Sequence, residues 1–186
     1  MCSTLSSSQE ISMGSYGAKE LASGFRTVRK NTIQIAEDIP ESQYDFVAAP
    51  DTMSVGATLK HIAIAPMMYE NMHREMRVTT LKGFDFPALI ARVRVEEEKP
   101  RSKAEIVELL TSEGERFASW LESTTPEFLA EMFSDPIGNE RSRLESLMSP
   151  KEHEMHHRGQ LMLIERMLGI VPHLTRARQQ RQQPAS

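Results

Sequence analysis

The chain has 186 residues, of which 39% are hydrophobic and 26% charged, and its formal net charge is −4. This is the composition of an ordinary folded protein, and the lack of a basic excess argues against a nucleic-acid partner. No run approaches the roughly 18 apolar residues of a membrane span, and the single cysteine, Cys2, excludes an internal disulfide, so we expect a cytoplasmic protein without a membrane partner.

The two ends of the chain differ in composition from the middle. Residues 1–16 are rich in serine and lack the apolar core of a signal peptide, and residues 179–183 read Gln-Gln-Arg-Gln-Gln. Segments so poor in apolar residues cannot bury enough surface to fold by themselves. We therefore predict disordered tails at residues 1–16 and 174–186 around a single domain at residues 17–173.

The spacing of apolar residues predicts two helices in the first half of the domain. In residues 18–37 they recur near the helical period, and Pro40 ends the segment. Ser54 fits the N-cap of a second helix that runs to about Met76. Pro66 lies inside this helix and should kink it, because proline has no N–H to donate to the preceding turn.

The next segment is a crossover followed by further helix signals. Residues 78–100 show little periodicity, and residues 88–98 fit either a short helix or an irregular connection. Residues 102–105, Ser-Lys-Ala-Glu, form a capping box that starts a third long helix. Residues 125–127, Thr-Pro-Glu, indicate a brief helical turn, and residues 135–138, Asp-Pro-Ile-Gly, a turn.

A fourth long helix is predicted from near Ser142 to Leu168, where Gly169 and Pro172 form a strong stop signal. Pro150 indicates either a kink or a restart within it. No segment alternates clearly enough to predict a strand. Four main helices with a long crossover between the second and third predict an all-α four-helix bundle.

Two histidines in the last predicted helix, His153 and His157, are candidate metal ligands. They lie one turn of about 5.4 Å apart, on the apolar stripe that continues through Leu161, Ile164 and Leu168. Because an unpaired buried imidazole costs on the order of 1–3 kcal/mol, each needs a partner. A metal ion would satisfy both. The alternative is two core histidines bonded to carbonyls or carboxylates, and the inward-facing pair favours the metal.

A third ligand must come from another helix. His61 shares the inward edge of the second predicted helix, whereas His73 has polar neighbours and is predicted to face solvent. His156 points about 100° away from the metal face, and His173 follows the helix end, so both are predicted at the surface. Three imidazoles with one open position are typical of a catalytic site, and such ligands suit zinc, nickel, iron, manganese and cobalt.

The letters His153-Glu154-x-x-His157 also match the zinc-protease signature, in which Glu154 would be the general base. The metzincin form of this signature requires a histidine where Leu163 stands. Glu165 lies too far along the same helix to reach the ion, and no strands for a protease cleft are predicted. We therefore reject the protease, and Glu154 stays only as a candidate proton carrier.

Two segments resemble a known family. Residues 54–63 read Ser-Val-Gly-Ala-Thr-Leu-Lys-His-Ile-Ala, and residues 153–161 read His-Glu-Met-His-His-Arg-Gly-Gln-Leu. In order and separation they resemble the DinB/YfiT family of metal-dependent enzymes, over residues 18–172. The resemblance implies a four-helix bundle, commonly dimeric, with a metal held by His61, His153 and His157. This agrees with the set of inward-facing histidines.

The resemblance also has implications for partners and for single residues. It implies a small-molecule substrate and a homodimer, and some members are transferases and isomerases that use low-molecular-weight thiols. Gln160 matches the family's motif, where it supports the helix or a ligand; the alternative is a packing amide. Pro66 and Pro150 depart from the usual pattern.

Three possible functions therefore remain open. In the first, a divalent metal, with zinc or nickel favoured, activates a thiol or water for transfer to, or hydrolysis of, a small molecule, with Glu154 or Tyr69 as candidate proton carriers. In the second, the metal pins two helices together in a non-catalytic structural or stress-response protein. A scaffold that binds no metal is a third possibility.

Overall fold

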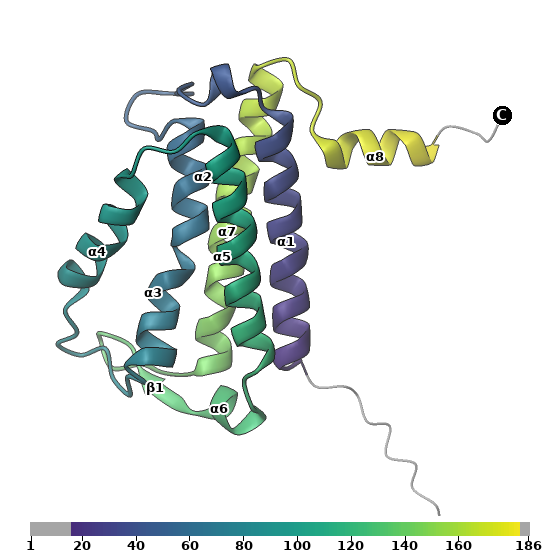
Figure 1. The fold of residues 1–186 in the computed structure, drawn as a ribbon. Coiled ribbons are helices and arrows are strands. Elements are labelled where there is room, and N and C mark those ends of the chain that lie inside the picture. Colours follow the sequence, from purple (N-terminus) through teal and green to yellow (C-terminus); the bar gives the residue numbers. More distant parts are fainter. Residues whose placement is uncertain (1–15, 183–186) are drawn as a thin grey trace, which may run out of the picture.

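The computed structural model describes residues 16–182, and its long helices form the predicted all-α four-helix bundle (Figure 1). The bundle helices are α1 (Ala18–Asp38), α2 (Val55–Ile64) continued by α3 (Pro66–Glu70), α5 (Lys103–Glu122) and α7 (Arg143–Met167). Both α1 and α2 pack against α5 and α7. The predicted crossover is also present, and it contains α4 (Phe86–Glu98), which packs against α2 and α3.

The helix starts follow from local chemistry. The hydroxyl oxygen of Ser54 accepts from the backbone N–H of Ala57, and that of Ser142 accepts from the N–H of Glu145. Ser102 and Glu105 form the predicted capping box at the start of α5. These side chains satisfy N–H groups that have no partner within the first turn of a helix.

The two internal prolines have different effects. Pro66 separates α2 from α3 at the position where a kink was predicted. Helix α3 continues into a π-helical turn, η2 (Asn71–Glu75). Pro150 lies within α7 without interrupting it, and α7 is one helix of 25 residues. Of the two predicted alternatives at Pro150, the restart is therefore wrong.

Two segments differ from the sequence-based expectation. After α6 (Pro126–Ala130), the turn at residues 135–138 joins two short antiparallel strands, β1 (Met132–Ser134) and β2 (Glu140–Ser142), where none was predicted. Three residues are too few to show an alternating pattern. The tail predicted to be disordered from residue 174 instead contains α8 (His173–Gln182), which extends away from the bundle (Figure 1).

Both the local sequence and a contact with the bundle favour helix α8. It consists largely of arginine, glutamine and alanine, which favour helix. Arg176 ties it to α1 through an ion pair with Asp38 at 2.6 Å. The rest of the predicted C-terminal tail, and the predicted N-terminal tail except Tyr16, lie outside the described residues.

The apolar core forms two clusters at different levels of the bundle. One includes Ile35, Leu59, Leu110 and Leu161; the other includes Leu21, Phe25, Phe117 and Leu147. Between these levels, α1 and α7 contribute a buried ion pair, Arg29 with Glu154. The core is therefore interrupted by a polar layer, at the height of the histidines on α7.

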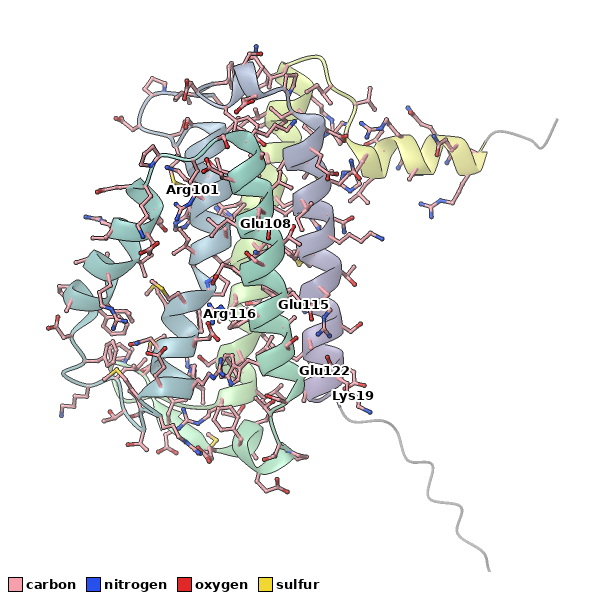
Figure 2. The ribbon with its side chains drawn as sticks, viewed as in Figure 1. Lys19, Arg101, Glu108, Glu115, Arg116 and Glu122 are labelled. Carbon is pink, nitrogen blue, oxygen red and sulfur yellow. The ribbon has the colours of Figure 1, made fainter. Side chains whose placement is uncertain are left out.

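The outer surface carries ion pairs between neighbouring helices. Glu115 and Glu122, labelled in Figure 2 on α5, each pair with Arg26 of α1 at 2.7 Å. Such exposed pairs usually contribute less than about 1 kcal/mol. Among the described residues, no helix combines the length and the apolar character that a bilayer span requires.

Candidate metal centre

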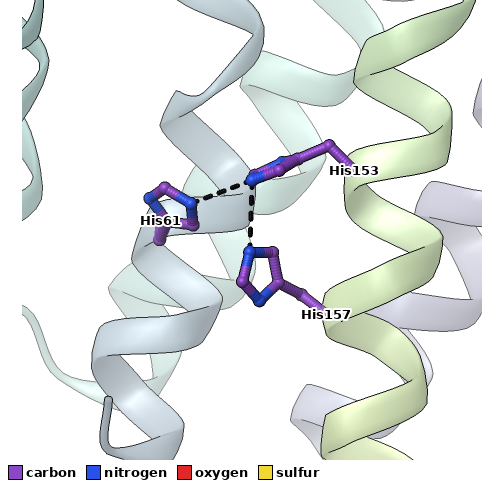
Figure 3. A group of neighbouring side chains, drawn as sticks. All are labelled: His61, His153 and His157. Atoms are coloured by element: carbon purple, nitrogen blue, oxygen red, sulfur yellow. Dashed lines mark hydrogen bonds between the residues drawn. The ribbon is translucent and has the colours of Figure 1, made fainter. Parts of the chain in front are cut away.

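Three histidine side chains from two helices converge at one point. Nε2 of His153 lies 3.0 Å from Nε2 of His61, which comes from α2, and 3.1 Å from Nε2 of His157 (Figure 3). All three donor atoms lie within 4.8 Å of one another. In a tetrahedral zinc site, bonds of about 2.0–2.1 Å place the ligand nitrogens about 3.3 Å apart. The spacing therefore fits three ligands of one ion.

The hydrogen-bond partners of Nδ1 determine which ring nitrogen carries the proton in His61 and in His157. Nδ1 of His61 lies 2.7 Å from a carboxylate oxygen of Glu97, on α4, and Nδ1 of His157 lies 2.8 Å from Oε1 of Gln160. Because both oxygens accept, each neutral ring carries its proton on Nδ1 and presents the Nε2 lone pair to the centre. The proton of His153 can satisfy only one of these two lone pairs. A cation would satisfy all three nitrogens.

The environment keeps His153 and His157 of α7 neutral. Burial, together with the smaller effects of the neighbouring His157 and His61, lowers the pKa of His153 to about 4. Burial also lowers the pKa of His157, although its hydrogen bond with Gln160 opposes this effect. Neutral imidazole is the form that binds metals.

A largely apolar cavity of about 320 Å³ opens beside this cluster. His61 and His153 form part of its wall, together with polar side chains that include Tyr69, Ser146 and Ser149. The apolar part of the wall comes from helices, from the loop before α4 and from β1: Met68, Met72, Leu81, Phe86, Val93 and Phe133. A second cavity of about 350 Å³ is lined by His157 and Gln160. The imidazoles are therefore reachable from two sides.

Glu154, the candidate proton carrier, has a different environment. Glu154 is 1% exposed, and its carboxylate binds Arg29, with both oxygens 3.0 Å from Nε. Burial raises the pKa of Glu154, and the charge of Arg29 opposes this rise. Glu154 lines neither cavity that contains the histidines. Tyr69, the other candidate, does line the cavity of about 320 Å³ beside His61 and His153, and burial raises the pKa of its hydroxyl.

The other histidines lie outside the cluster. His156 is exposed, as predicted. The prediction for His73 was wrong: it is 1% exposed, because Arg143 and Ser146 satisfy both ring nitrogens inside the bundle. His173, predicted at the surface, is half-buried, because α8 brings it against α1, where Nε2 lies 3.0 Å from Oδ1 of Asn31.

Two residues that orient the ligands carry different signals in the sequence. Glu97 lies in the run Glu96-Glu97-Glu98, which has the pattern of a solvated helix face, so nothing in the sequence distinguishes it. Gln160 follows His157 by three residues, which places the two on one helix face. Of the alternatives considered for Gln160, the structure favours support of a ligand.

Comparison with known proteins gives one family. The family model described as the DinB superfamily matches residues 25–161. A search of curated protein sequences found no match.

Solved structures resemble the chain over most of its length. A DinB-like protein from Bacillus subtilis is 23% identical, with a TM-score of 0.60 over 81% of this chain and 92% of that one. YfiT from Bacillus subtilis is 16% identical, with a TM-score of 0.61 over 91% of this chain and 93% of that one. It is described as a probable metal-dependent hydrolase with an unusual four-helix bundle topology. The mycothiol-dependent maleylpyruvate isomerase is 10% identical, with a TM-score of 0.61 over 77% of this chain and 60% of that one. At these identities the likeness shows a shared fold.

Proposed function

Since the chain belongs to the DinB superfamily, we propose that His61, His153 and His157 hold one divalent metal ion that serves catalysis on a small molecule. The observation that carries the proposal is the convergence of three Nε2 atoms beside an apolar cavity. The outer hydrogen bonds with Glu97 and Gln160 support it, because such partners orient metal-binding imidazoles in many proteins.

When bound, a divalent ion held by three imidazoles supplies a Lewis acid that lowers the pKa of a water or thiol at its open position. The chain's own residues orient the ligands and shape the cavity. Glu97 and Gln160 keep the rings turned inward, and the apolar wall excludes bulk water from a small organic substrate. Tyr69 is the proton carrier that the cavity favours, since Glu154 is engaged with Arg29.

The proposed reaction is hydrolysis or thiol-dependent transfer. The descriptions of two structural relatives, a probable metal-dependent hydrolase and a mycothiol-dependent isomerase, support these two options. Zinc or nickel is the metal we expect first, with iron, manganese and cobalt as alternatives, because imidazole suits all of them. A low-molecular-weight thiol as co-substrate and a homodimer remain predictions.

The test begins with protein prepared without a histidine tag. Elemental analysis should find about one divalent ion per chain, and His157→Ala should lose both the ion and all metal-dependent turnover in panels of hydrolase and thiol-transfer substrates. His156→Ala is a matched control, because it removes an exposed imidazole from the same turn. Unchanged turnover in His157→Ala would contradict the proposal, and a metal-free wild type would also contradict it.

A non-catalytic role is the second candidate. One observation favours it: the three histidines join α2 to α7 close to the break at Pro66, so an ion there would hold a weakened helix in place. In that case a chelator should lower the melting temperature strongly, while neither substrate panel shows turnover. Turnover that disappears with the chelator and returns with the metal would exclude this role.

A further inference from the structure

A second buried polar group adjoins the same cavity, and its three members come from two helical segments. Arg143 begins α7 and is 1% exposed; His73 lies in the π-helical turn η2 and is also 1% exposed. Ser146, one turn further along α7, is 6% exposed and lines the cavity. Nη1 of Arg143 lies 2.9 Å from Nδ1 of His73, and Nε2 of His73 lies 2.9 Å from Oγ of Ser146.

The direction of these hydrogen bonds follows from the chemistry of arginine. A guanidinium group only donates, so Nδ1 of His73 must be the acceptor and carries no proton. The neutral ring then has its single proton on Nε2, which it donates to Ser146. Burial and the positive charge of Arg143 lower the pKa of His73 to about 4, so the ring stays neutral at physiological pH. Its tautomer is therefore determined.

This tautomer restricts what Ser146 can do. Its oxygen accepts from His73, so its own hydroxyl proton needs a different acceptor. Among residues 16–182, no protein group is hydrogen-bonded to that proton. His73 cannot act as the base that would turn Ser146 into a nucleophile, because Nε2 is already protonated and the Nδ1 lone pair is bound to Arg143. The hydroxyl of Ser146 is therefore free to donate a hydrogen bond to a molecule in the cavity.

The distance between Ser146 and the histidines indicates how long such a molecule would be. Ser146 and His153 are seven residues apart on α7, which is about 10.5 Å along the helix axis, and both line the apolar cavity. Arg141 lines the cavity too, but its guanidinium is paired with Asp135 at 3.3 Å. That pairing offsets its charge, and among the described residues that line this cavity there is no other arginine or lysine to bind a carboxylate.

We propose that the substrate is an elongated, apolar molecule that carries a neutral carbonyl oxygen at the end remote from the histidines, and that Ser146, oriented by His73 and Arg143, donates a hydrogen bond to this oxygen. The inference rests on the proposed function, which assigns the histidine end of the cavity to the metal and the reacting group. It adds a specificity-determining residue about two helical turns away.

The experiment uses two hydroxamic acids of equal length as probes on the full-length, metal-loaded protein. One has a plain alkyl tail, and the other has a methyl ketone at the far end of the tail. Isothermal titration calorimetry should show the ketone probe binding about tenfold more tightly than the alkyl probe, a typical effect of one hydrogen bond. Ser146→Ala should remove this preference and leave the affinity of the alkyl probe unchanged, whereas Ser146→Thr, which keeps a hydroxyl, should retain part of it.

Spectroscopy tests the same proposal without a variant. The infrared carbonyl stretch of the bound ketone should lie at lower frequency than in an apolar solvent, and nitrogen NMR should find the proton of His73 on Nε2. Equal affinities for the two probes in wild type, a proton on Nδ1, or a covalent adduct of Ser146 with phenylmethylsulfonyl fluoride would each overturn the inference. Loss of metal from the wild type in elemental analysis would instead refute the proposed function.

Discussion

Arg29 of α1 and Glu154 of α7 form a buried ion pair in which Nε of Arg29 lies 3.0 Å from both carboxylate oxygens. The same guanidinium donates to the carbonyl of Leu110, on α5, and to that of Ile62, on α2. One side chain therefore contacts all four bundle helices. The carbonyl of Ile62 is available because Pro66, four residues later, has no N–H to donate to it.

The first prediction concerns this pair. Glu154→Ala should lower the free energy of unfolding by about 3–5 kcal/mol, because it leaves the buried charge of Arg29 without its partner. The double variant Arg29→Met, Glu154→Met should lose less than Glu154→Ala, because it removes both charges. Urea unfolding measures the free energy of unfolding of the wild type and of both variants. A loss below about 1 kcal/mol in Glu154→Ala would show that the pair does not hold the bundle together.

The second prediction concerns the space that Arg29 occupies. A Cβ added at Gly114, on α5, would lie 2.7 Å from Cγ of Arg29. Gly114→Ala should therefore destabilise the protein by about 1–3 kcal/mol, as overpacking usually does. Gly159, on α7, is a matched control, since a Cβ there meets nothing within 4 Å. Gly159→Ala should stabilise the protein by up to about 1 kcal/mol, because alanine favours helix over glycine. Thermal melting compares the two variants.

The third prediction concerns Glu97. Its carboxylate accepts from Nδ1 of His61, and removing such a partner typically lowers metal affinity by about 10–100-fold. Glu97→Ala should therefore weaken metal binding by that factor, measured by competition with a chelator of known affinity. Glu98→Ala is the control, because Glu98 is the exposed neighbour in the same acidic run. An equal loss in both variants would point to a general charge effect instead.

The fourth prediction concerns Glu165, a buried carboxyl of α7. Among the described residues, neither of its oxygens has a hydrogen-bond partner. Burial and, to a smaller extent, the nearby charge of Asp38 raise the pKa of Glu165 to about 7, against the opposing effect of Arg176 and Arg166. The folded protein therefore holds this proton over a pH range in which the unfolded chain has already lost it.

The raised pKa of Glu165 should make the folded protein less stable as pH rises. A raised pKa in the folded state contributes stability below the unfolded value, near 4.5, and this contribution is lost as pH rises to about 7. Unfolding by urea should therefore show a loss of roughly 2–3 kcal/mol between pH 4.5 and pH 7.5 from this group. Glu165→Gln, which stays neutral, should flatten that slope. A slope identical to that of the wild type would contradict the assignment.

Much of the fold follows from local patterns in the sequence. The period of the apolar residues and the caps at Ser54 and Ser102 predict the long helices, since these signals act within a few residues of one another. The turn at residues 135–138 was predicted for the same reason, but the three-residue strands beside it carry no periodic signal. The helix α8 was missed because its contact with the bundle, through Arg176 and Asp38, joins residues 138 positions apart.

For the candidate site, the sequence by itself determined that His153 and His157 lie on one helix face and that His61 points inward, because helical geometry places residues four apart side by side. Only the tertiary structure decided which groups orient these rings. Glu97 reaches His61 from a crossover helix whose run of glutamates is typical of a solvent-exposed surface. In the same way, Arg29 engages Glu154, and Arg143 makes a buried partner of His73. These contacts depend on how the helices pack, so no local pattern could reveal them.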